Sequence, residues 1–166
     1  MTIADAISSN YLSVRLRIDA ACRRAGRDPK SVTLVAVTKY AQVEWVRCLV
    51  EHAAAELGES RPQQLVQRAH EISAPVHGYR IHWHLIGNLQ RNKVRSILPH
   101  VTLLHAADSL RLLESIDRIA QEIDLRPRVL LEVSLCGEEA KHGFQADELL
   151  SEWDQLQNLE RVRSRG

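Results

Sequence analysis

The sequence lacks a dominant charge, a secretory leader and any long apolar run. Its 22 basic and 21 acidic side chains leave a formal net charge of +1. Such a balance gives no overall electrostatic attraction for nucleic acid or an anionic membrane. A membrane-spanning helix needs about 20 apolar residues, which no run reaches. The opening MTIADAISSNYL has no basic region followed by an apolar core. We therefore expect no nucleic-acid partner, no membrane partner and no secretory signal.

Cysteine is also scarce. The three cysteines, Cys22, Cys48 and Cys136, are odd in number, scattered and absent from any CxxC pair. They are typical of reduced thiols in a cytoplasmic protein, where they mostly serve as packing residues. Hydrophobic residues at 45% and charged residues at 26% match a globular composition. The length of 166 residues suits one domain, so we expect residues 1–166 to form a single domain.

Helical and strand patterns alternate along the chain. Apolar residues at three- and four-residue steps predict helices over 3–22, 42–55, 62–72, 89–98 and 147–159, and another from a cap at Asp108 or Ser109 through Ile119. Apolar runs predict strands over 32–38, 56–59, 81–86, 101–106 and 129–134, with a further strand beginning within 161–165. This alternation predicts a parallel α/β architecture.

A glycine-rich phosphate loop is missing after the first predicted strand, where the turn reads Thr-Lys-Tyr-Ala. Its absence disfavours an open dinucleotide-binding sheet and favours a barrel. Active residues of such barrels lie at the carboxyl ends of the strands. The residues at these ends are Lys39, Glu59 and Ser60, Ile86 and Gly87, Ala107 and Asp108, and Ser134.

Lys39 is the most reactive of these candidates. Strand alternation places it on one face with Val35 and Val37. Inside a barrel, partial desolvation would favour a neutral amine, which is the nucleophile that forms a Schiff base with a carbonyl. The alternative is a strand-end lysine that only reaches water.

Two further patterns permit a functional and a structural interpretation. His82 and His84 form an HxH pair that could hold a divalent metal in a hydrolase if Asp108 or Glu132 converged on it. A packed core histidine is the alternative. The basic segment 87–95 could attract an anion or form a solvated helix face, and the glycine-rich segment 137–143 predicts a polar loop.

Several strings resemble one known family. They are LVAVTKY, LGES, IHWHLIGNLQRNK, HAADS and LLEVSLCGEEAKHGF, in this order. Their order and spacing are similar to those of the pyridoxal phosphate homeostasis proteins, also called proline synthetase co-transcribed homologs. The string from Trp83 to Lys93 is the most specific, and the resemblance extends from about Val32 to the end of the chain.

The resemblance implies a TIM-type barrel like the N-terminal domain of alanine racemase. It also implies that Lys39 holds pyridoxal 5′-phosphate (PLP) as a Schiff base, with Val37, Ser60 and His84 as further cofactor-binding residues. Family members are regarded as carriers in PLP homeostasis, without a catalytic residue or a metal, and amino acids would engage the cofactor by transimination. Two positions depart from the family pattern: Ser60 replaces the usual asparagine, and Tyr40 the usual threonine.

The family barrel has eight strands, whereas this chain matches an N-terminal helix and about the first five βα units. We expect an incomplete barrel without the family's phosphate-binding segments, and a monomer or weak self-association through the open barrel edge. Three alternatives stay open: a fragment of a PLP-dependent racemase or decarboxylase, a metal-dependent barrel hydrolase using His82 and His84, and an inert truncated remnant.

Overall fold

The computed structural model describes residues 2–52, 54–73, 78, 80–135 and 143–164. Cys136 and residues 137–142 of the predicted polar loop lie outside this range. Cys22 and Cys48 are free thiols. None of the helices in the described ranges is long and apolar enough to cross a bilayer.

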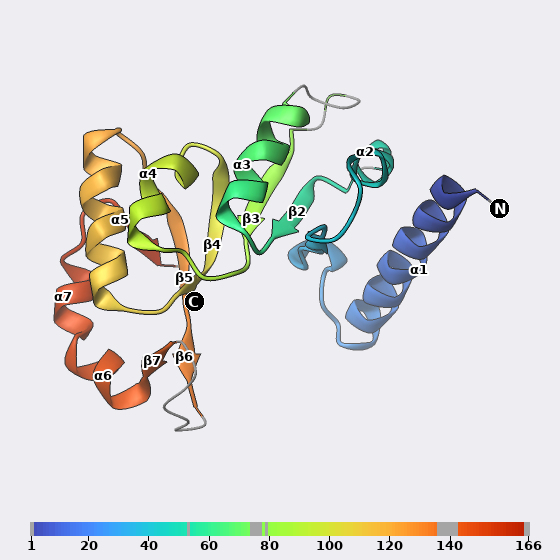
Figure 1. The fold of residues 1–166 in the computed structure, drawn as a ribbon. Coiled ribbons are helices and arrows are strands. Elements are labelled where there is room, and N and C mark those ends of the chain that lie inside the picture. Colours follow the sequence, from blue (N-terminus) through green and yellow to red (C-terminus); the bar gives the residue numbers. More distant parts are fainter. Residues whose placement is uncertain (1, 53, 74–77, 79, 136–142, 165–166) are drawn as a thin grey trace.

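Six parallel strands form one sheet within the described residues, in the order β1-β2-β3-β4-β5-β8 (Figure 1). They are β1 (Ala36–Val37), β2 (Glu56–Glu59), β3 (His82–Leu85), β4 (Val101–Ala107), β5 (Arg128–Leu131) and β8 (Arg163–Ser164). Neighbouring strands follow one another along the chain with helices between them, which is the predicted βα repeat. β6 (Val133–Ser134) and β7 (Phe144–Gln145) pair separately.

The α-helices are α1 (Ile3–Arg24), α2 (Val43–Glu51), α3 (Pro62–Glu71), α4 (Val94–Ile97), α5 (Leu110–Glu122), α6 (Ala146–Ser151) and α7 (Trp153–Gln157). A capping box begins α1: the Thr2 hydroxyl accepts from the Asp5 amide, and the Asp5 carboxylate accepts from the Thr2 amide. Figure 1 shows α3, α4 and α5 covering one face of the sheet, and α1 beside α2 at the β1 end.

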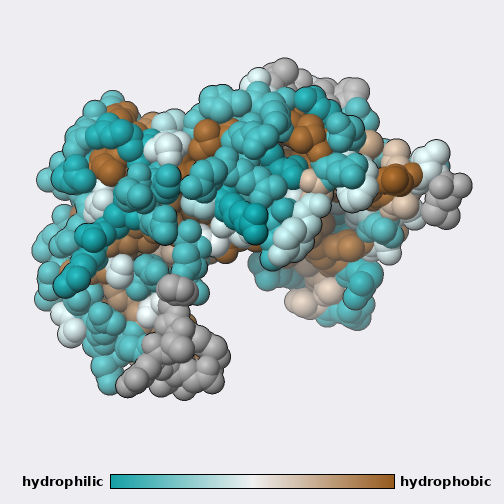
Figure 2. All heavy atoms as spheres, viewed as in Figure 1, coloured by the Kyte–Doolittle hydropathy of each residue, from teal (hydrophilic) through white to brown (hydrophobic). Residues whose placement is uncertain are grey.

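The core lies between the sheet and these helices. One set of alternating strand residues is buried there, namely Leu57, Leu85, Leu104 and Val129. The opposite face is more open, since the side chain of Val37 is 55% exposed. Figure 2 shows a largely hydrophilic surface with separate hydrophobic patches. The exposed large apolar side chains of α1 are Ile3, Leu12, Val14 and Leu16.

Several predicted elements are shorter than expected. The strand predicted over 32–38 has ladder pairing only at Ala36–Val37. The helix predicted over 89–98 consists of a 3₁₀ turn, Arg91–Lys93, followed by the single turn of α4. The helix predicted over 147–159 divides at Glu152, whose φ of −94° and ψ of 1° interrupt the helical path.

The strand predicted over 129–134 also divides, at Glu132. Its amide donates to the carbonyl of Ala107 (2.9 Å), whereas its carbonyl accepts from the amide of Phe144 (2.8 Å). The chain therefore changes its pairing partner from β4 to β7 at this residue. The further strand predicted within 161–165 is confirmed by β8, which pairs with β5.

Candidate functional site

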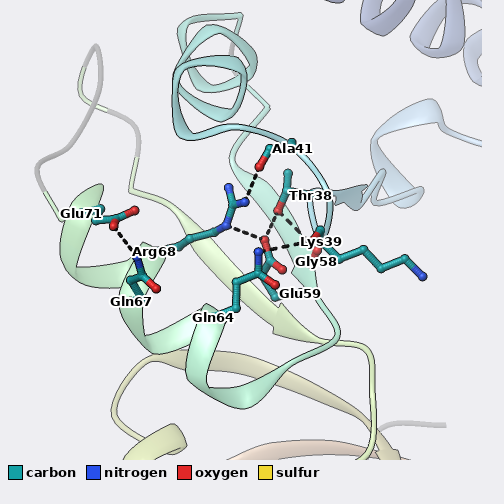
Figure 3. Close-up of polar contacts among 9 residues, drawn as sticks. All are labelled: Thr38, Lys39, Ala41, Gly58, Glu59, Gln64, Gln67, Arg68 and Glu71. Atoms are coloured by element: carbon teal, nitrogen blue, oxygen red, sulfur yellow. Dashed lines mark hydrogen bonds and ion pairs between the residues drawn. The ribbon is translucent and has the colours of Figure 1, made fainter.

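Lys39 lies two residues beyond the last ladder pair of β1. The Thr38 amide donates to the carbonyl of Gly58 (2.9 Å), and the Ala41 amide donates back to the carbonyl of Thr38 (2.9 Å), which turns the chain. Strand alternation places Val37 on the face of the sheet away from the helices (the inner face), opposite the buried Thr38. Lys39 lies in the turn itself, and its side chain extends away from the buried Glu59 and Arg68 (Figure 3).

The Lys39 side chain is half-buried. Its amine forms no ion pair with a carboxylate in the described part of the chain, and Nζ lies 5.1 Å from the centroid of the Tyr40 ring. A lysine amine without a carboxylate partner keeps its three hydrogen-bond donors available to a ligand.

The carboxyl ends of β1, β2 and β3 lie side by side. In the ladder Val37 pairs with Gly58, and Gly58 pairs with His84. Lys39 and Ser60 follow two residues further along their strands. Next to them, a Cβ at Gly87 would lie 2.3 Å from the Ser60 carbonyl oxygen, so the loop after β3 depends on glycine for this contact. The structure thus brings the ends that carry Lys39 and Ser60 to one edge of the sheet.

Apolar side chains surround Gly58 on the inner face. A Cβ at Gly58 would contact the side chain of Val35 at 3.2 Å and that of Ile86 at 3.4 Å. Val37 pairs with Gly58, so Val35, Val37 and Ile86 place apolar side chains together near the strand end that leads to Lys39.

His84 has protein partners for both ring nitrogens. Its Nε2 lies 2.6 Å from Glu56 Oε2, and its Nδ1 lies 2.8 Å from His105 Nε2. Because a carboxylate only accepts, Nε2 of His84 carries a proton. In a neutral His84 ring, Nδ1 therefore accepts from His105. The other oxygen of Glu56 lies 2.7 Å from His82 Nδ1.

The charges of this network shift two pKa values. Burial alone would raise the pKa of Glu56, but the hydrogen bonds and charges of His82 and His84 outweigh it and hold that pKa below 4.5. Burial, assisted by the charge of His84, lowers the pKa of His105 below its ordinary value. The HxH pair therefore binds a carboxylate. A group of three or more His, Cys, Asp or Glu able to hold a metal ion is absent among the described residues.

A second network lies on the helix-covered face of the sheet (the outer face), between the strand ends and α3 (Figure 3). Glu59 Oε1 accepts from the Thr38 hydroxyl (2.6 Å) and from Arg68 Nε (3.0 Å). Burial raises the pKa of Glu59, and the bond from Thr38 and the charge of Arg68 act against that rise.

Sequence reasoning missed Glu56 and Arg68 as members of these networks. Arg68 had a signal, because it is a charged residue at helical spacing between the buried Leu65 and Ile72. The role of Glu56 had no signal, because it depends on the register that places Glu56 opposite His82.

No protein-family model matches the chain. Curated relatives do, and they are named pyridoxal phosphate homeostasis protein. The relative from Synechocystis is 34% identical over 135 residues, covering 81% of this chain and 61% of its own length. The relative from Escherichia coli K12 is 32% identical over 162 residues, covering 96% of this chain and 68% of its own. The chain thus spans just under or just over two thirds of these relatives.

Solved structures give the same result. PipY of Synechococcus elongatus with PLP bound has a TM-score of 0.77 and 32% identity, over 99% of this chain and 68% of that one. An alanine racemase of Clostridium difficile, at 16% identity and a TM-score of 0.64 over 92% of this chain, shows the fold alone. The expected fold, part of an alanine-racemase-type βα barrel, is confirmed.

Proposed function

Because the chain belongs to the pyridoxal phosphate homeostasis protein family, we propose that it binds PLP on Lys39 as a carrier in the cytoplasm. The observation that carries this proposal is the amine of the half-buried residue Lys39, which has no carboxylate partner in the described ranges and follows the carboxyl end of β1. The chain would act as a single domain, without catalytic turnover, and as a monomer or weakly associated through the β1 edge of the sheet.

The residues around Lys39 fit this cofactor. When bound, PLP supplies an electrophilic aldehyde on an aromatic ring. Lys39 would hold this group through its amine nitrogen, which would form a double bond to the aldehyde carbon while the aldehyde oxygen and the two amine protons would leave as water. Val35, Val37 and Ile86 offer an apolar surface for the ring, and Ser60 offers a hydroxyl at the neighbouring strand end.

In the same proposal, His84 supports the site without contacting the cofactor through a ring nitrogen. Both nitrogens are engaged by Glu56 and His105, so His84 contributes a fixed, buried ring on β3, in register with Gly58 and Val37. Amino acids would be the small-molecule partners, since a free amine can replace Lys39 on the aldehyde carbon.

Chemical trapping tests the proposal. The chain is mixed with PLP, reduced with borohydride, digested and mapped by mass spectrometry. We expect one reduced adduct, on Lys39, and a visible absorbance band that free PLP lacks. Lys39→Ala should abolish both, whereas Lys30→Ala, at an exposed lysine of the 3₁₀ turn Pro29–Ser31, should leave both unchanged. An unmodified Lys39 with the spectrum of free PLP would refute the proposal.

A further inference from the structure

The backbone around Lys39 is held by side chains from neighbouring elements. The bond from the Thr38 amide to Gly58 continues the backbone pairing of β1. Beyond it, the carbonyl of Lys39 accepts from Gln64 Nε2 (3.2 Å), and the carbonyl of Ala41 accepts from Arg68 Nη2. Both donors belong to α3. The path of the chain on either side of the amine therefore depends on α3.

Arg68 is itself fixed by Glu59. Its Nε lies 3.0 Å from Glu59 Oε1, and the same oxygen accepts from the Thr38 hydroxyl at 2.6 Å. Thr38, Glu59 and Arg68 are 1%, 0% and 5% exposed. Side chains this deeply buried have little rotational freedom. The series of contacts from Glu59 on β2, through Arg68 on α3, to the backbone beside Lys39 is therefore rigid.

The network contacts the backbone of Lys39 and leaves its amine free. Figure 3 shows the Lys39 side chain extending away from the Glu59–Arg68 pair. The pair lies on the side of the sheet where Thr38 is buried, and the Lys39 amine lies away from it. A group placed in this way can set the position of the amine without competing for it.

The Glu59–Arg68 pair is a poor source of stability. Glu59 Oε2 and Arg68 Nη1 are buried without a hydrogen-bond partner among the described residues. A buried ion pair with unsatisfied atoms repays little of its desolvation cost, and such pairs are often no more stabilising than apolar residues of the same volume. Stability therefore does not explain why this pair is present, whereas fixing the backbone path of the Lys39 segment does.

We propose that Thr38, Glu59, Gln64 and Arg68 form a clamp that positions Lys39 for its reaction with the PLP aldehyde. The clamp rests on the proposed function for its purpose. Its members are positioning residues: Gln64 and Arg68 bond the carbonyls of Lys39 and Ala41, and Thr38 and Glu59 hold Arg68 through side-chain contacts. None of these printed contacts involves the reacting amine. Holding the amine in place before the cofactor arrives removes an ordering cost from binding.

Two mild variants with matched controls test the clamp. Thr38→Val keeps the shape and removes the hydroxyl, whereas Thr38→Ser keeps the hydroxyl. Gln64→Ala removes the bond to the Lys39 carbonyl. Gln67→Ala removes a glutamine of the same helix that bonds the exposed Glu71. Amide hydrogen exchange of residues 38–45 is measured in the chain without PLP, and PLP affinity is measured by titration.

We expect Thr38→Val and Gln64→Ala each to speed exchange in residues 38–45 and to weaken PLP binding by about tenfold, the equivalent of one hydrogen bond. Thr38→Ser and Gln67→Ala should match the parent chain. Unchanged exchange in both test variants, or exchange that rises equally along the whole chain, would overturn the clamp. A parent chain without an adduct on Lys39 would refute the proposed function, whereas the exchange data would still decide the clamp.

Discussion

Lys39 combines a constrained backbone with an amine that forms no ion pair within the described ranges. Its carbonyl is bound by Gln64, and its neighbour Thr38 is bonded to Glu59. The amine meets no carboxylate in the part of the chain that the structure describes. A lysine at a solvated strand end needs none of this support. These contacts therefore favour a chemical role for Lys39 over that of a surface anchor.

Glu56 links the two histidines of the HxH pair, and its ionisation controls their contacts. The folded protein holds its pKa below the ordinary 4.5, so the group stabilises the fold above about that pH. This stabilisation is lost as the pH falls through the lower, folded pKa.

We expect Glu56→Gln to lower the free energy of unfolding by about 1–3 kcal/mol at pH 7, since it weakens two charge-assisted hydrogen bonds at a partly exposed carboxylate. Urea unfolding at pH 7 and pH 3.5 measures the effect. The difference in free energy of unfolding between the parent chain and Glu56→Gln should be smaller at pH 3.5. Glu114→Gln, at an exposed position of α5, is the control and should change neither value by much. A larger difference in free energy of unfolding at pH 3.5 would contradict a stabilising role for ionised Glu56.

The loops after β2 and β3 pack through a contact that only glycine allows. The Ile86 amide donates to the carbonyl of Glu59 (2.9 Å), which continues the β2–β3 ladder up to Gly87. A Cβ at Gly87 would lie 2.3 Å from the Ser60 carbonyl oxygen, closer than real Cβ contacts. The partner is backbone, so the strand ends themselves would have to separate.

Gly87→Ala should therefore destabilise the protein by about 1–3 kcal/mol, as overpacking does. Gly58→Ala is the matched comparison, because its Cβ would meet the Val35 side chain at 3.2 Å, which a small shift relieves. Urea unfolding of both variants should show the larger loss for Gly87→Ala. The reverse order would show that the two loops do not pack as described.

At the β8 edge of the sheet, a carboxylate of α5 holds the segment that leads into the last strand. Asp117 Oδ1 accepts from the backbone amides of Arg161 (2.6 Å) and Val162 (3.1 Å), just before β8 begins. Gln121 Nε2 donates to the other oxygen at 2.9 Å. Asp117 is buried, and it ties residues 44 and 45 positions away in sequence to the helix layer.

Asp117→Ala should release β8 from the sheet, because two partly buried backbone amides lose their acceptor. We expect faster amide exchange in residues 159–164 and a loss of about 1–3 kcal/mol in the free energy of unfolding. Asp154→Ala, at an exposed aspartate of α7, serves as the control. Exchange in 159–164 that matches the parent chain would show that β5 alone holds β8.

The sequence by itself determined the βα repeat, the parallel sheet and the family. Apolar runs and helical spacing depend on local residue order, and Trp83–Lys93 is a contiguous string. Element ends were less predictable. Val32–Val35 read as strand yet have no ladder partner, and Glu132 ends β5 because its carbonyl pairs with Phe144 instead of continuing along β4.

Only the tertiary structure decided what surrounds Lys39 and His84. Arg68 reaches the Ala41 carbonyl across 27 residues, and Glu56 reaches His84 across 28. Such contacts depend on strand register and on how α3 packs, which residue order does not specify locally. The sequence therefore identified the lysine, whereas the fold decided which side chains hold its backbone and leave its amine free.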